Sequence, residues 1–190
     1  MSGHGFHAHG PHDHAVEHAG HSGDDFASRV AAMTAILATV GALLGYQGGA
    51  TQNDAMMFKN EAAIKKTEAS DQWNFYQAKS GKQNLAELAV ELTEGDKRER
   101  YLKEIERYKQ EKAEIMVKAK ALDEASKAAD KKSEESLHLH HRWAQSMTAI
   151  QVAISLAAIT ILARRRWLQN AAIGVAAIGL GLAGMALMHL

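Results

Sequence analysis

Histidines are the residues whose type and spacing most directly suggest chemistry in this sequence. Seven of the 11 histidines lie within the first 25 residues, among Gly, Ala and Asp. Neutral imidazole binds Zn, Cu and Ni, so this tail is predicted to bind one of these metals weakly, through His4, His7, His9, His12 and His14. Its composition cannot bury a core, so residues 1–25 are predicted to be a disordered tail. The alternative is a polar leader whose histidines bind nothing specific.

A second group of histidines begins at His138. On a helix His138 and His141 share a face, and together they could hold one metal at two points. Two ligands are too few for a structural or catalytic metal site. A third would have to come from a neighbouring subunit, or from Glu134 or Glu135. The simpler interpretation is a set of polar residues at a membrane interface.

Other kinds of chemistry find no support in the sequence. Carboxylates are spread along the chain, no Ser, His and Asp set converges, and there is no glycine-rich phosphate loop. With no cysteine there is no thiolate nucleophile and no Cys-based metal site. Lys and Arg total 22, as do Asp and Glu, so no net field favours nucleic acid. We therefore expect a non-enzyme with no nucleic-acid partner and no cofactor beyond weakly bound metal.

The stretch that organises the chain runs over residues 96–163. It contains neither Gly nor Pro, and it changes from heavily charged to wholly apolar. Such a pattern is typical of one helix that leaves water and enters a membrane. A single proline and 6% aromatic residues agree with this interpretation. The predicted class is therefore an all-α integral membrane protein.

Three segments are apolar enough to span a bilayer. The first contains the 17 uncharged residues from Val30 to Tyr46, at the short limit for about 30 Å of hydrocarbon. No Asp, Glu, Lys or Arg interrupts the cores of the segments, so none resembles a proton relay. The predicted boundaries are 26–50, 143–163 and 169–190 for the three transmembrane helices, and 164–168 for an Arg-rich turn between the last two.

Small residues recur on one face of two of these segments, where another helix can approach closely. In the first segment they repeat every fourth residue, and in the third they are spaced three or four apart. The predicted packing or oligomer positions are Gly41, Gly45 and Gly49, and Gly174, Ala177, Gly181 and Gly184. An oligomeric channel built from these helices is our third functional hypothesis.

Residues 51–142 are predicted to form a soluble antiparallel helical hairpin, a coiled coil, with its turn at 93–96. Gly48 and Gly49 allow a break in the helix before it. Residues facing each other across the hairpin should have numbers that sum to about 189. This pairing places Trp73 against Ile115 and Met116.

The same register makes further predictions. It sets Leu85 against Ile105, and it brings Tyr46 level with Trp143 as two aromatic residues at a membrane interface. On the first arm the apolar stripe is expected to step sideways near Gly81 and continue through Leu85, Leu88 and Leu92. On the returning arm the expected seam is thin, with Lys112 as its charged interruption, and comprises Tyr101, Ile105, Tyr108, Ile115, Ala119, Leu122, Ser126 and Ala129.

One motif in the first arm carries a resemblance. The run Asp71-Gln72-Trp73-Asn74-Phe75-Tyr76-Gln77-Ala78-Lys79, preceded by Lys59-Asn60-Glu61-Ala62, resembles an uncharacterised family of bacterial membrane proteins, a domain of unknown function. The likeness covers roughly residues 25–190. It implies one hydrophobic segment before a charged helical region and two after it, in a bacterial plasma membrane, and it implies no activity. Trp73 and Tyr76 share a helix face, where they are expected to fix the hairpin register or clamp a neighbouring subunit.

Arg164, Arg165 and Arg166 predict the orientation of the protein in its membrane. Three arginines in a short loop favour the cytoplasmic side, where they are expected to bind lipid headgroups. The hairpin would then lie in the periplasm.

The first functional hypothesis is therefore a membrane-anchored hairpin that self-assembles, as a homo-oligomer, or attaches to another envelope protein. The second hypothesis is metal binding or trafficking through the histidine tail.

Overall fold

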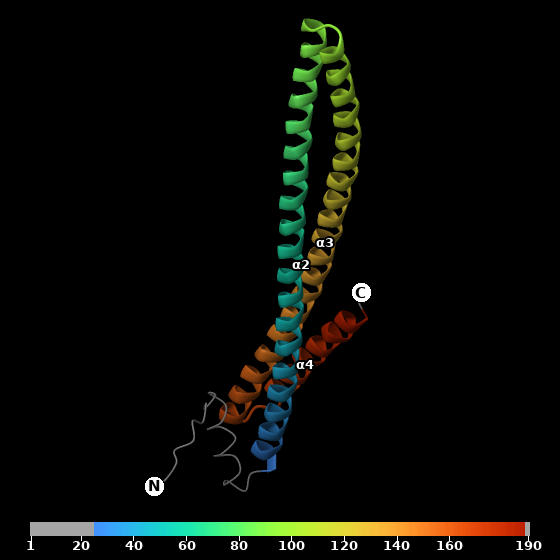
Figure 1. The fold of residues 1–190 in the computed structure, drawn as a ribbon. Helices are drawn as coiled ribbons and strands as arrows, with labels where there is room; N and C mark the ends of the chain where they lie inside the picture. Colours follow the sequence, from blue (N-terminus) through green and yellow to red (C-terminus); the bar gives the residue numbers. More distant parts are fainter. Residues whose placement is uncertain (1–24, 189–190) are drawn as a thin grey trace, which may run out of the picture. The chain divides into compact units, whose positions relative to one another are not determined.

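The computed structural model describes residues 25–188 as helices joined by short connections (Figure 1). The helices are α2 (Asp25–Leu92), α3 (Asp96–Ala163) and α4 (Arg166–Leu187). Across this described range there is no strand, so the predicted all-helical class is confirmed. Helix α3 has the bounds of the stretch without Gly or Pro.

Helix α2 continues through both sites where the sequence suggests an irregularity. The break that Gly48 and Gly49 allow does not occur, and the helix is also unbroken at Gly81. A mid-helix glycine costs only about 0.5–1 kcal/mol relative to alanine. A Cβ on Gly48 would lie 3.4 Å from Cβ of Trp143, at ordinary van der Waals distance. Gly48 is therefore a point of close contact with α3 inside an unbroken helix.

The chain divides into two compact units. Among the described residues, the apolar unit comprises 25–53 and 136–188, and the charged unit is Asp54–Glu135. In the charged unit, parts of α2 and α3 run antiparallel to each other and are joined by the connection at 93–95, in the green-to-yellow part of Figure 1. At that connection Gly95 adopts the left-handed φ of 61° that glycine tolerates.

Ion pairs establish the register of the charged unit. Lys59 pairs with Asp130 at 2.5 Å and Lys66 with Asp123 at 2.8 Å. Lys79 pairs with Glu111 at 2.5 Å. The residue numbers of these pairs sum to 189, 189 and 190, which confirms the predicted pairing of about 189.

The inner seam of the charged unit follows a seven-residue repeat of mostly small side chains. On α2 the inward residues include Ala55, Ala62, Ala69, Tyr76, Gln83 and Val90, and on α3 they include Ile105, Lys112, Ala119, Ser126 and Ser133. Such small residues let the helix backbones approach closely. Accordingly the Ser126 hydroxyl donates to the Ala62 carbonyl and the Ser133 hydroxyl to the Ala55 carbonyl, each at 2.8 Å.

The predicted sideways step of the α2 stripe does not occur. Leu85, Leu88 and Leu92 are 68%, 57% and 75% exposed, so the expected contact of Leu85 with Ile105 is wrong. Ile105 instead packs in one cluster with Ala86 and Val90. The seven-residue repeat that begins at Ala55 continues in phase to Val90, and it leaves the three leucines on the outer face.

The apolar unit packs the first part of α2, the last part of α3, and α4 around one cluster that includes Leu37, Leu44, Ile150, Ile154 and Ala183. Each of the three helices contains a segment long and apolar enough to cross a membrane. The chain is therefore compatible with a membrane location.

Candidate interaction and metal sites

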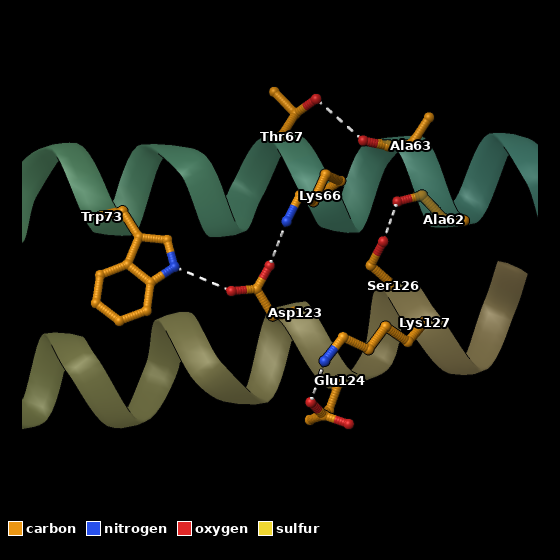
Figure 2. A network of polar contacts seen from close by, with 9 residues as sticks. All are labelled: Ala62, Ala63, Lys66, Thr67, Trp73, Asp123, Glu124, Ser126 and Lys127. Atoms are coloured by element: carbon orange, nitrogen blue, oxygen red, sulfur yellow. Dashed lines mark hydrogen bonds and ion pairs between the residues drawn. The ribbon is translucent and has the colours of Figure 1, made fainter.

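The tryptophan of the family-like motif lies in a polar network of the charged unit (Figure 2). The Trp73 indole Nε1 donates to Oδ2 of Asp123 at 3.0 Å, and Lys66 Nζ donates to Oδ1 at 2.8 Å. Hydrogen bonds from Lys66 and then from Trp73 hold the pKa of Asp123 below its ordinary value. One α3 carboxylate is thereby tied to two positions of α2.

Trp73 reaches farther along α3 than its predicted partners, Ile115 and Met116. Long side chains on a helix lean toward its N-terminus, which carries the indole toward the level of Lys66. The ring also makes an edge-on contact with Tyr76, with centroids 5.8 Å apart. The geometry is that of a register-fixing contact, and clamping of a neighbouring subunit stays a prediction.

The charged interruption of the seam, Lys112, is compensated by polar partners from α2. Its Nζ donates to Oε1 of Gln83 at 3.1 Å and lies 5.1 Å from the centre of the Tyr76 ring. At the neighbouring position of α3, a hydrogen bond from Lys79 holds the pKa of Glu111 below its ordinary value. The middle of the hairpin is therefore a polar and aromatic layer between the alanine-rich seam and the small apolar cluster near the turn.

His138 and His141 line the same surface cavity of about 330 Å³, as their spacing predicts. The other lining residues are Arg142, Gln145, Leu182 and Met185, and the guanidinium opposes binding of a cation. Within residues 25–188 no group of three His, Asp or Glu residues could hold a metal, so neither Glu134 nor Glu135 completes a site in this chain. The tail histidines lie outside the described residues, and metal binding there stays a prediction.

His140 has a structural role that the sequence analysis missed. Its Nδ1–H donates to the carbonyl of Gly48 at 2.8 Å, a contact that the absent side chain of Gly48 leaves open. The sequence signal for this role is the seven-residue spacing that places His140 in phase with Ser126 and Ser133, which also donate to carbonyls of α2.

Trp143 and Tyr46 differ in exposure although both line one cavity of about 520 Å³. Tyr46 is 76% exposed, whereas Trp143 is 4% exposed and belongs to the core of the apolar unit. Trp143 is therefore a core residue of this chain, and the level of both aromatic residues at a membrane interface stays a prediction. Its indole Nε1 is buried and has no hydrogen-bond partner among the described residues.

The predicted small-residue face of α2 meets α3 inside the chain. A Cβ on Gly41 would lie 3.4 Å from Cγ2 of Ile150, and one on Gly45 would lie 3.3 Å from Sδ of Met147. Gly49 has no such neighbour within 4 Å. Gly48 makes the equivalent contact, because the contact repeats at alternating spacings of four and three residues.

On α4 the close helix contact uses a different face from the predicted one. A Cβ added to Gly174, Gly181 or Gly184 would meet nothing within 4 Å, and Ala177 is exposed. The packed face is Ala172, Ala176, Gly179, Ala183 and Ala186. Its tightest point is Gly179, whose carbonyl accepts a 2.7 Å hydrogen bond from Ser146. Contact of the outward face with a second chain remains a prediction.

The Arg-rich turn is short and exposed. Helix α3 ends at Ala163, α4 begins at Arg166, and Arg164 adopts a left-handed φ of 51°. The Arg164 N–H donates to the Thr160 carbonyl at 2.9 Å, which satisfies one carbonyl at the helix end. All three arginines are exposed, and their binding of lipid headgroups stays a prediction.

Comparison with known proteins gives a family and no activity. No curated protein and no solved structure matches the chain. A family model described as "Domain of unknown function (DUF4337)" matches residues 26–189. The match takes in all three helices except the first residue of α2, and the chain therefore belongs to this family.

Proposed function

We propose that this protein is a non-enzymatic integral membrane protein of the bacterial envelope, in which the hairpin of the charged unit mediates self-assembly. The three apolar helical segments support insertion in a bilayer. In this arrangement the apolar unit anchors the chain. The arginine turn faces the cytoplasm and the hairpin extends on the other side.

The observation that carries the proposal is the distribution of apolar side chains in the charged unit. Its inner seam buries alanines and serines, such as Ala62, Ala69, Ala119 and Ser126. Its larger apolar residues are mainly exposed, among them Ile64, Phe75, Leu85, Leu92, Leu102 and Val117. A two-helix arm built in this way buries little apolar surface of its own. Neighbouring protein surfaces supply the missing burial.

Self-assembly suits this composition better than catalysis. The Lys–Asp and Lys–Glu pairs of the hairpin join its two helices along their length. Such pairs set the register and converge on no common point at which a substrate would react. The structure of the hairpin thus provides a long surface of defined register, which is what an assembly element requires.

The proposal is tested by measuring the mass of the assembled protein and the resistance of the hairpin to proteolysis. Full-length protein in nanodiscs or mild detergent should form a discrete homo-oligomer by light scattering across a concentration series. The hairpin should resist proteolysis under the same conditions. Monomers at every concentration, together with rapid cleavage within residues 54–135, would overturn the proposal.

A further inference from the structure

The outer face of α2 near the turn carries a second apolar stripe, separate from the inner seam. It comprises Ala78, Gly81, Leu85, Leu88 and Leu92, at alternating spacings of three and four residues. The three leucines are 68%, 57% and 75% exposed. Single exposed leucines are ordinary, but three on one stripe of a charged hairpin indicate a contact surface.

The spacing of this stripe defines the shape of its partner. Residues three and four apart are the a and d positions of a coiled coil, which take up the side chains of another helix. The stripe keeps the seven-residue period of the inner seam but occupies another face of α2. The partner is therefore a helix with a matching seven-residue period.

We propose that residues 78–92 of α2 pair in parallel with the same residues of a second copy of this chain, an inference that rests on the proposed function. Copies anchored in one membrane by the same helices hold each residue level with its own counterpart. Leu85 then meets Leu85 of the second copy, and Leu92 meets its own counterpart. Gly81 gives the leucine side chains near it room to interdigitate.

Charge agrees with this pairing and limits its extent. No charged residue occupies the stripe between Ala78 and Leu92. In a parallel pair, flanking positions five residues apart face each other, which places Asn84 opposite Ala89. Continued toward the N-terminus, the same spacing passes through the polar Asn74 to Asp71. Two Asp71 carboxylates would repel each other, so the contact ends between Asp71 and Ala78.

The contact is short, so it depends on the membrane. Three leucines in each copy give a weak association in dilute solution. Anchoring in a bilayer raises the effective concentration of neighbouring copies, and that converts weak contacts into stable ones. Confinement of this kind favours a second copy over a soluble partner.

The absence of cysteine from the sequence permits a direct test. Leu85→Cys and Leu92→Cys are made singly in the full-length chain, and membranes are treated with a short bismaleimide. Glu87→Cys is the matched control, because Glu87 is exposed and lies about 200° around α2 from Leu85. We expect covalent dimers from both leucine positions and none from the control.

A double variant tests the same surface without a cross-linker. Leu85→Glu with Leu92→Glu should raise the dissociation constant of the oligomer about tenfold or more, while Glu87→Lys leaves this constant unchanged. Because both leucines are exposed in the single chain, helix content should stay constant, and circular dichroism checks this.

The outcomes separate this inference from the proposed function. The protein could be an oligomer by mass and yet give no cross-link at either leucine, or an equal cross-link at position 87. Either result would overturn the stripe as the contact surface and leave the proposal of self-assembly intact. A cross-link to a different protein would overturn the second copy as the partner. A monomer by mass in a bilayer, together with no cross-link at either leucine in membranes, would overturn both proposals.

Discussion

At Asp123, a lysine and an indole from α2 both donate to one carboxylate of α3. Their hydrogen bonds lower its folded-state pKa, so the charged form stabilises the fold. This stabilisation is fully present above the unfolded-state pKa of about 4. It is lost as the pH falls through the lower folded-state value.

We therefore expect the hairpin to lose stability below about pH 4, and Asp123→Asn to flatten that dependence. Fluorescence of Trp73, in a chain whose Trp143 and Trp167 are replaced by Phe, reports denaturant unfolding at each pH. Glu111, whose pKa Lys79 lowers in the same way, adds to the acid loss. An identical acid profile for Asp123→Asn would show that the carboxylate does not couple folding to protons.

Two exposed glycines of the hairpin are expected to respond oppositely to alanine. Gly95 has a φ of 61°, so Gly95→Ala should cost about 1–2 kcal/mol. Gly81 lies inside α2 with nothing within 4 Å of a Cβ, and Gly81→Ala should gain about 0.5–1 kcal/mol. Denaturant midpoints of the two variants check the signs. These signs apply to the dissociated single chain, where a loss at Gly81 would contradict its open surface. In the paired oligomer the stripe covers Gly81, so the gain should disappear there.

The histidine tail allows a prediction about how metal binding changes when the tail is deleted. Isothermal titration of Zn, Cu and Ni into the full-length chain should show weak binding, which is lost when residues 1–22 are deleted. The pair His138 and His141 remains in the shortened chain as the internal control, and no third ligand joins it within the described residues. Equal binding by both proteins would remove any metal role from the tail.

At the scale of elements, long helices were predictable wherever Gly and Pro are absent. The bounds of α3 illustrate this, since helix propensity and charge pattern agree over its whole length. The reverse of this rule does not hold at Gly48, because the helix continues through the glycine and packs against Trp143. Sequence alone shows that a glycine is present, whereas only the neighbouring helix decides whether it breaks or packs.

Helix α4 shows how small residues mislead in the same way. Both of its faces are rich in Gly and Ala, and the predicted face of Gly174 and Gly181 points outward. We expect Gly179→Leu to destabilise the apolar unit by about 1–3 kcal/mol, since a Cβ there would lie 3.0 Å from Cδ1 of Ile150. Thermal unfolding in detergent measures the loss.

Gly181→Leu is the matched control for Gly179→Leu, with nothing within 4 Å of its Cβ. It should leave the stability of the single chain unchanged. Equal losses in both variants would contradict the assignment of the packed face. A change of oligomer mass in Gly181→Leu alone would instead support contact of this face with a second chain.

For the whole molecule, the register of the hairpin was predictable and the orientation of its side chains was not. One turn and two uninterrupted arms fix which residues are level, as the pairs of Lys59 and Lys66 demonstrate. Hydrophobicity then assigned Leu85 and Leu88 to the interior, whereas the repeat of small residues controls the inner face. The candidate sites show the same difference between register and side-chain direction. The position of Trp73 was predictable, but its hydrogen bond to Asp123 depends on the indole pointing toward the N-terminus of α2.

Orientation in the membrane gives the prediction with the widest consequences. Glu94 and Arg165 are exposed residues at the two connections between helices, and the cysteine-free chain permits single-cysteine labelling at each. A membrane-impermeant maleimide should label Glu94→Cys in intact spheroplasts, and Arg165→Cys only after permeabilisation, because the arginine-rich turn favours the cytoplasm.

Each alternative labelling pattern has a distinct meaning. The reverse pattern would place the hairpin in the cytoplasm, where it would meet cytoplasmic partners, while leaving three spans intact. Labelling of both sites from the same side would show that α3 does not cross the membrane. A single crossing between residues 94 and 165 would place the two sites on opposite sides. The parallel pairing of α2 would survive the first result, since copies would still stand at equal depth, but not a mixture of both orientations in one membrane.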